Sequence, residues 1–187
     1  MDAAEPQGPD LVIRAARVDE ARTIAEIHVR AWLWAYRDLL PPVVLAGLSV
    51  ERRAVFWHGW LTGAAPRRQL WLASQRERVV GFVAAGPSRD PDAEADTGEI
   101  YAVYLEPDVV GTGVGRSLCG RAVERLPHDG FRVATLWVLA TNARARRFYE
   151  QGGWRADGAL KTEEQAGVAL HEVRYRLPLP GRLSPRT

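Results

Sequence analysis

The chain of 187 residues contains very little cysteine, and this scarcity excludes several kinds of protein. A single cysteine, Cys119, rules out an internal disulfide framework and a cysteine-rich metal site, and its apolar neighbours indicate a packed thiol rather than a nucleophile. The four histidines show no spacing with Asp or Glu that is typical of a metal centre. No apolar run approaches the ~20 residues that cross a bilayer. We therefore expect no metal site and no membrane span.

Lysine is equally scarce, because Lys161 is the only one and nearly all positive charge is arginine. The net charge is +2, and the arginines are interleaved with acids instead of forming a stripe, so no nucleic-acid partner is expected. The first ten residues, MDAAEPQGPD, lack the basic and apolar parts of a secretory signal. A cytoplasmic location is the expectation.

The order of apolar and polar stretches predicts one domain over residues 10–177, between a flexible arm over 1–9 and a proline-rich flexible tail over 178–187. Segment 87–98 is expected to be a loop. The predicted order is β-α-α-β-β-β-α-β-α-β, an α/β (α+β) domain with a mixed sheet. Strands are expected at 11–13, 69–74, 79–85, 99–105, 131–139 and 168–177, and helices at 19–36, 50–61, 114–126 and 142–151.

A glycine-rich loop follows the strand at 99–105 and opens an amphipathic helix. Backbone N–H groups at a helix N-terminus have no intrahelical partner, and the helix dipole places partial positive charge there. Glycines let a large anion approach that backbone. The loop therefore predicts a phosphate cradle, formed by Gly111, Thr112, Gly113, Val114, Gly115 and Arg116.

Two common phosphate-binding motifs do not match this loop. A nucleoside triphosphatase loop needs Gly-x-x-x-x-Gly-Lys-Ser/Thr, and the register places Val110 at its first Gly and Arg116 at its Lys. A dinucleotide fingerprint needs a third Gly where Arg116 stands, and it follows the first strand of its unit rather than a later one. Both ligand classes are therefore disfavoured.

A third pattern fits more of the chain. The segment EIYAVYLEPDVVGTGVGRSL, from Glu99 onward, resembles the coenzyme A motif of the GNAT N-acetyltransferase superfamily, Gln/Arg-x-x-Gly-x-Gly/Ala. Gly113 and Gly115 match it, and Val110 departs from it at the Gln/Arg position. The block NARARRFYEQGGW, from Asn142, is similar to the family's Asn-x-x-Ala-x-x-Phe-Tyr-x-x-x-Gly-Phe/Trp motif. The resemblance extends over Leu11 to Leu177 and implies acetyl-CoA as the cofactor.

The resemblance also implies roles for individual residues. The strand before the loop would splay from its neighbour, and the pantetheine arm would pair with the backbone of Val103, Tyr104 and Leu105. The hydroxyl of Tyr149 would lie near the coenzyme sulfur, where a proton donor assists departure of a thiolate. Asn142 would contact the pantetheine arm and also fits the N-cap of the helix that it opens. A purely structural role for each of these residues remains open.

Glu99 is the candidate general base, since an ammonium substrate must lose a proton before its nitrogen attacks a thioester. A solvated strand-end Glu is the alternative, with water removing the proton. His28 is more typical of a packed core histidine, and His171 of a structural or surface one. The acidic segment 90–96 is expected to be a solvated loop that could attract a positively charged acceptor.

Aromatic residues are concentrated in the first two predicted helices. Trp32 and Tyr36 lie four apart on one helix face, and Trp57 and Trp60 lie three apart on the next. Core packing explains such residues, but by resemblance these helices also form one wall of the acceptor site, where Trp32 and Tyr36 could hold a cationic or apolar amine.

Together these features predict an N-acetyltransferase that moves an acetyl group from acetyl-CoA to a primary amine by direct attack. The expected acceptor is a small molecule, with a peptide N-terminus as a second possibility, and a homodimer is possible. The competing hypothesis is a silent module on the same fold that binds acyl-CoA or a metabolite without turnover. The identity of the acceptor is not predicted, because fold does not fix substrate.

Overall fold

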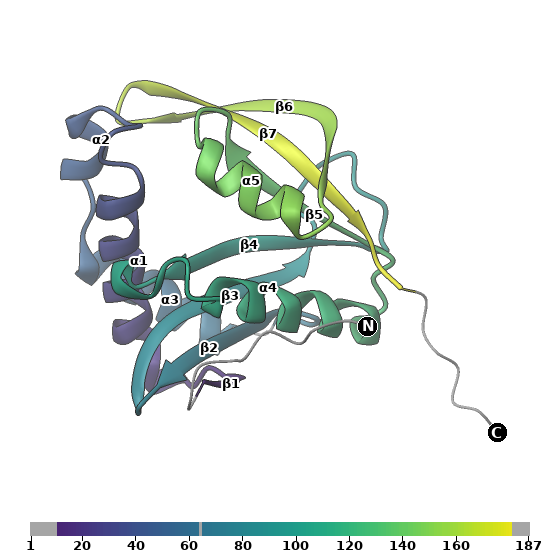
Figure 1. Cartoon of the computed structure of the whole chain (residues 1–187), viewed down its shortest axis with the longest axis horizontal. Coiled ribbons are helices and arrows are strands. Elements are labelled where there is room, and N and C mark those ends of the chain that lie inside the picture. Colours follow the sequence, from purple (N-terminus) through teal and green to yellow (C-terminus); the bar gives the residue numbers. More distant parts are fainter. Residues whose placement is uncertain (1–10, 64, 181–187) are drawn as a thin grey trace.

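A seven-stranded mixed sheet forms the centre of the protein (Figure 1), which we describe from a computed structural model over residues 11–63 and 65–180. The strand order is β1-β2-β3-β4-β5-β7-β6, in which β4 and β5 are parallel and every other pair is antiparallel. The strands are β1 (Val12–Ala15), β2 (Gln69–Gln75), β3 (Arg78–Pro87), β4 (Thr97–Leu105), β5 (Val133–Leu139), β6 (Arg155–Gln165) and β7 (Val168–Pro178).

Helices cover both faces of this sheet. The longer pair α1 (Ala21–Ala35) and α3 (Val50–Thr62) packs on one face, over Leu72, Phe82 and Ala84. On the other face lie α4 (Val114–Arg125) and α5 (Ala143–Gln151), against a larger core that includes Val83, Leu136 and Tyr175. Short segments complete the fold: α2 (Pro42–Ala46) and the 3-10 turns Val18–Glu20, Pro107–Val109 and Leu126–Asp129.

Local sequence explains where several helices begin. The Ser49 hydroxyl accepts a hydrogen bond from the Arg52 amide at 3.2 Å, as the N-cap of α3. The Asn142 side chain accepts from the Ala145 amide at 3.0 Å, as the N-cap of α5. None of the helices in the described ranges is long and apolar enough to cross a membrane.

The parallel pair β4 and β5 separates soon after it starts, and this separation positions the site. Their ladder comprises three residue pairs and ends at Glu99 opposite Thr135. Beyond this point β4 continues on β3 to Leu105, whereas β5 continues on β7 to Leu139. The bridging in β4 also skips Tyr101, where a bulge separates Ile100 from Ala102. The sheet is therefore open in its middle.

The structure confirms the predicted fold class and extends the predicted order by two elements. Strand β6 was not predicted, because its sequence, RADGALKTEEQ, is polar, yet it pairs with β7 as the edge of the sheet. Helix α2 is a short helix over Pro42–Ala46, with Pro42 at its first position, and was not predicted. Strand β4 begins inside the loop predicted over 87–98.

The predicted boundary of the tail at 178 is also corrected. Strand β7 includes Pro178, and Leu179 is buried, with its amide donating to the Arg132 carbonyl at 2.9 Å. The predicted arm over 1–9 and residues 181–187 of the tail lie outside the described residues.

Candidate active site

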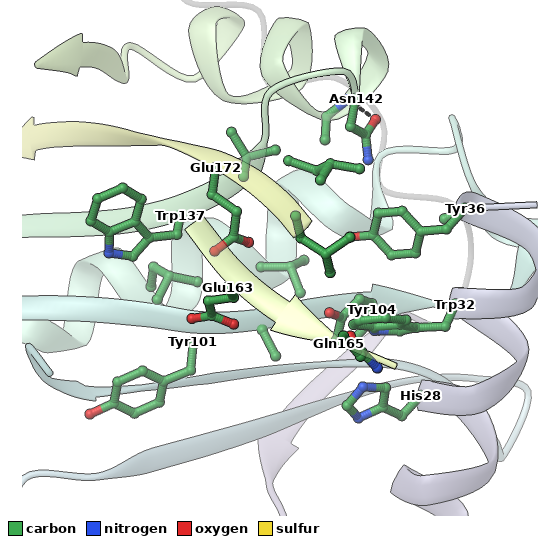
Figure 2. A pocket seen from close by; sticks show the side chains of 18 of the residues that line it. His28, Trp32, Tyr36, Tyr101, Tyr104, Trp137, Asn142, Glu163, Gln165 and Glu172 are labelled. Atoms are coloured by element: carbon green, nitrogen blue, oxygen red, sulfur yellow. Dashed lines mark hydrogen bonds between the residues drawn. The ribbon is translucent and has the colours of Figure 1, made fainter. Parts of the chain in front are cut away.

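A cavity of about 920 Å³ occupies the space where β4 and β5 have separated. Backbone and side chains of Ile100–Tyr104 line one side and those of Trp137–Leu139 the other, while α1, α3 and the β6–β7 hairpin enclose the rest. Leu40 and Val44 pack on Val168 and Leu170, so the hairpin closes over the cavity beside α2. Figure 2 shows Tyr36 reaching into this space from α1, with Glu163 and Glu172 turned toward it from the hairpin.

The glycine loop lies at the start of α4, next to the end of β4. Gly111 and Gly113 have φ values of +87° and +92°, which L side chains rarely adopt, and an added Cβ at either position would meet nothing within 4 Å. Gly113 is the N-cap of α4, and the first i→i−4 bond of the helix runs from the Ser117 amide to the Gly113 carbonyl. The Thr112 amide donates to the Val109 carbonyl at 3.3 Å, whereas the amides of Gly113, Val114 and Gly115 at the start of the helix have no intrahelical partner.

The other loop residues have mixed environments. The Thr112 hydroxyl donates to the Val109 carbonyl at 2.7 Å, and the Val114 side chain is buried in the core. Gly115 lies against the end of β4, since an added Cβ would be 3.2 Å from Leu105 Cδ1. Arg116 is exposed. The loop thus presents backbone rather than side chains near Leu105.

Two residues predicted to contact the cofactor line the cavity from α5. Asn142 is buried, and its oxygen is committed to the helix cap while its amide nitrogen faces the cavity side (Figure 2). Tyr149 packs against Phe148, Trp154 and Tyr175. Burial raises the pKa of Tyr149 far above its usual value, and Cys119 and Tyr104 raise it further. Its hydroxyl therefore keeps its proton across the physiological range.

Glu99 also lines the cavity, and its carboxylate is bound by Arg89. Its side chain is only 1% exposed. Oε2 accepts from the backbone N–H of Arg89 at 2.9 Å and from its Nε–H at 3.2 Å, and Oε1 accepts from Nη2–H. The alternative of a solvated strand-end Glu is thus wrong, and the predicted base has a guanidinium on both oxygens.

The predicted acceptor wall is an aromatic cluster built on α1. His28 stacks on Tyr104 with 4.6 Å between ring centroids, and Trp32 contacts Tyr36 at 4.8 Å. Trp57 is buried, and its Nε1–H donates to Nδ1 of His28 at 3.2 Å. These side chains line the cavity as well as packing in the core, so the two interpretations of the aromatics are compatible.

His28 is the most perturbed histidine. Burial and, to a smaller extent, the charge of the nearby Arg53 lower its pKa to about 3. Since Trp57 Nε1 can only donate, Nδ1 of His28 accepts and the proton of the neutral ring is on Nε2. His28 is therefore a neutral ring with one N–H directed away from Trp57.

This pKa predicts acid sensitivity of the fold. In the unfolded chain His28 takes up a proton below its usual pKa of 6.5, whereas the folded chain takes it up only near 3. Stability is therefore lost as the pH falls, by about 2 kcal/mol between pH 7 and pH 5. Urea unfolding at both pH values should show this loss in the wild type and not in His28→Gln, whose side-chain oxygen can still accept from Trp57. Equal losses in the two proteins would contradict the assignment.

Sequence reasoning missed the charged residues contributed by β6, β7 and α3. Lys161 Nζ pairs with Glu163 Oε1 at 2.7 Å and with Glu172 Oε2 at 2.9 Å, and all three line the cavity. Arg53 lines it from α3. Lys161 and Glu163 lie on the polar strand β6, and Glu172 lies on its partner β7. Because the sequence of β6 lacks hydrophobic alternation, the strand was not predicted, and neither was the place of these three residues in the cavity.

Two other expectations are settled by contacts outside this cluster. Asp90 and Asp92 of the acidic segment bind Arg174 at 3.0 and 2.9 Å, but only Asp90 is removed from solvent, since its side chain is 11% exposed and that of Asp92 is 64% exposed. His171 is exposed beside Thr162. Within residues 11–63 and 65–180, no group of three His, Cys, Asp or Glu side chains could hold a metal ion.

Comparison with known proteins gives a consistent result. Residues 22–154 match the model of the acetyltransferase (GNAT) family. An uncharacterized N-acetyltransferase of Archaeoglobus fulgidus is 41% identical over 122 residues, 65% of this chain and 80% of its own length. The N-acetyltransferase YuaI of Bacillus subtilis, also uncharacterized, is 29% identical over 90% of this chain and 93% of its own.

Among solved structures, the PaiA N-acetyltransferase of Thermoplasma acidophilum in complex with coenzyme A superposes with a TM-score of 0.71, at 16% identity, over 90% of this chain and 99% of its own. Its fold is the one described above, and the open ladder and uncovered glycine amides fit coenzyme A. The chain belongs to the GNAT acetyltransferase family and is an acetyl-CoA-dependent N-acetyltransferase.

Proposed function

We propose that this enzyme acetylates the primary amine of a small molecule. The observation that supports this proposal is the cavity of about 920 Å³, because it matches the size of small-molecule sites and is closed on one side by the contact of α2 with the β6–β7 hairpin. A peptide N-terminus would need an open groove for the following residues. When bound, acetyl-CoA supplies an activated acetyl thioester.

The chain itself would bind the cofactor through backbone groups. The amides of Gly111, Gly113, Val114 and Gly115 suit a pyrophosphate, and the unpaired side of β4 at Val103 to Leu105 suits an amide-bearing arm. Asn142 would add a side-chain contact through its amide nitrogen. Val110 departs from the family motif at its Gln/Arg position. Its amide donates to the Pro107 carbonyl, so Val110 offers the cofactor neither a free amide nor a polar side chain, and the cradle would depend on the backbone amides that follow it.

Two carboxylates compete for the role of proton acceptor. Glu99 remains the candidate from the sequence, but Arg89 donates to both of its oxygens. Glu172 contacts Lys161 through Oε2 at 2.9 Å, and among the described residues no other cation forms an ion pair with it. Glu172 and Tyr149 both contribute to raising the pKa of Tyr36, so both lie close to the Tyr36 side chain. This geometry favours Glu172 for removing the ammonium proton, with Tyr149 holding the proton for the departing sulfur.

Thiol release from acetyl-CoA in the presence of single amines tests the proposal, with mass spectrometry of the product. We expect amine-dependent release with at least one small amine. Glu172→Gln should lose rate about tenfold near pH 6.5 and less near pH 9, because the free amine needs no base. Glu99→Gln should lose rate evenly with pH, since it disturbs Arg89 rather than a proton acceptor.

If Glu99→Gln lost rate mainly near pH 6.5 and Glu172→Gln lost rate evenly with pH, Glu99 rather than Glu172 would be the base. Release of thiol only with peptides that carry a free N-terminus would contradict a small-molecule acceptor. Binding of acetyl-CoA without release to any amine would favour the competing hypothesis, a silent module that binds acyl-CoA.

A further inference from the structure

The only lysine of the chain, Lys161, lines the cavity of this N-acetyltransferase. Its Nζ contacts Glu163 Oε1 at 2.7 Å and Glu172 Oε2 at 2.9 Å, and it lies 4.8 Å from the centroid of the Trp137 ring. Figure 2 shows both carboxylates turned into the cavity from the hairpin, beside Trp137. The Lys161 side chain is 28% exposed, so it is neither sealed in the core nor free in solvent. The protein thus holds a primary amine of its own inside the cavity.

The Lys161 nitrogen lies where the nitrogen of an acceptor is expected. If Glu172 removes the ammonium proton, the acceptor nitrogen must come within hydrogen-bond reach of its carboxylate, and Lys161 Nζ is already there. Tyr149, the proposed proton donor, lines the same cavity, and Tyr149 and Glu172 both lie close to the Tyr36 side chain. The lysine, the proposed base and the proposed donor therefore border one space.

The residue type at position 161 carries a chemical meaning. A pair of carboxylates could be neutralised equally well by arginine, which the chain uses at every other position with a permanent positive charge. Arginine keeps its proton in proteins and cannot accept an acetyl group, whereas the lysine amine becomes a nucleophile once it loses a proton. The single departure from arginine thus places the one acetylatable side-chain amine of the chain in the cavity of an acetyltransferase.

We propose that Lys161 is itself an acetyl acceptor, which the enzyme acetylates in its own cavity when no acceptor amine is bound. This inference rests on the proposed function for Glu172 as the base. Burial acts to lower the pKa of Lys161, but its pairing with Glu163 and Glu172 holds that pKa above the usual value. Near neutral pH the amine is therefore protonated and needs a base before it can react, and Glu172 is already in contact with it.

In this step the Lys161 nitrogen forms an amide bond to the acetyl carbon and displaces the coenzyme A sulfur from it. The flexible stem of lysine lets Nζ leave the ion pairs to do so. The ammonium nitrogen gives up two protons: one passes to Glu172 and on to solvent, and the other replaces the proton that Tyr149 gives to the departing sulfur. The products are a neutral acetamide and a free thiol. Glu163 and Glu172 then lose the only cation with which they form ion pairs among the described residues.

Mass spectrometry of the protein itself tests this proposal. After incubation with acetyl-CoA and no added amine, we expect the intact chain to gain one acetyl group, which peptide mapping places on Lys161. Lys161→Arg keeps a cation beside Glu163 and Glu172 and should gain no acetyl group on a side chain. The rate constant should not depend on protein concentration, because the amine and the bound thioester belong to one molecule.

Arg155→Lys provides a reference lysine within the same protein. Arg155 is exposed on β6 and does not line the cavity, so the introduced lysine reports the slow reaction of a thioester with any exposed amine. We expect Lys161 to be acetylated about tenfold or more faster than the introduced lysine. Excess coenzyme A should slow the reaction at Lys161, because it displaces the donor from the cavity, and should leave the introduced lysine unaffected.

Acetylation of Lys161 no faster than that of the introduced lysine would overturn the proposal, as would a rate constant that rises with protein concentration or resists excess coenzyme A. An unmodified Lys161 in a protein that releases thiol with small amines would overturn it and leave the proposed function intact. Acetylation of Lys161 while no small amine is consumed would support it and refute the proposed function.

Discussion

Replacing Gly113 with valine is expected to weaken coenzyme A binding by about a hundredfold. Gly113 has a φ of +92° at the N-cap of α4, and a β-branched residue is strongly disfavoured in this conformation. Its Cβ would meet no protein atom within 4 Å, so the added methyl groups would extend into the space before the helix N-terminus. A pyrophosphate bound by the amides of that turn needs this space. Calorimetric titration with coenzyme A measures the loss.

Gly120→Ala is the matched control for this change. Gly120 lies in the same helix, has an ordinary helical φ and also has nothing within 4 Å of an added Cβ. Alanine there should raise the stability of α4 by up to ~1 kcal/mol and leave coenzyme A affinity unchanged. If Gly113→Val bound coenzyme A as tightly as Gly120→Ala, with both proteins folded by circular dichroism, the loop would not be the cradle.

The elements around the cofactor loop could be predicted because local chemistry determines them. Glycines with φ near +90° and an Asn that caps its own helix leave a signature within a few residues. The separation of β4 from β5 was predicted only through the family resemblance. Hydrophobic periodicity alone shows that both strands are apolar. It does not show that the ladder between them ends at Glu99.

Strand β6 was not predicted because its formation does not depend on the burial of apolar side chains. Most of its side chains are exposed, and it is held as an edge by backbone hydrogen bonds to β7, so hydrophobic alternation is weak in its sequence. Missing β6 also concealed the charged end of the cavity. Lys161 and Glu163 become neighbours of Glu172 only through the register of the hairpin, which pairs Lys161 with Glu172.

The partners of single site residues were equally beyond the sequence. Glu99 could be selected as a carboxylate at the start of a central strand, but its pairing with Arg89 depends on how the loop after β3 returns to the sheet. Likewise, His28 was expected to pack in the core, and it does so, stacked on Tyr104. That its Nε2–H would be left without an acceptor beside a cavity depends on Trp57, 29 residues away, occupying its other nitrogen.

Replacing Tyr149 with phenylalanine is expected to lower kcat by about a hundredfold and to leave coenzyme A affinity within about twofold. Burial raises the pKa of the Tyr149 hydroxyl, so it keeps its proton near neutral pH, as the proposed role of proton donor requires. Its side chain lines the cavity and contributes, like that of Glu172, to the raised pKa of Tyr36. Loss of the hydroxyl removes the proton for the departing sulfur and leaves the ring contacts in place. Single-turnover kinetics at saturating acetyl-CoA measure the effect.

Tyr175→Phe separates this role from a structural one. The Tyr175 hydroxyl is buried, accepts from Arg146 Nε–H at 3.1 Å and donates to Glu150 Oε1 at 2.6 Å. Its removal should lower the free energy of unfolding by ~1 kcal/mol and leave kcat unchanged. The Tyr149 hydroxyl makes no hydrogen bond within the described part of the chain, so Tyr149→Phe should show the opposite pattern: kcat falls and stability is retained. Loss of coenzyme A binding in Tyr149→Phe, with an unchanged kcat for the bound enzyme, would exclude the hydroxyl as the donor and leave the ring as a packing residue.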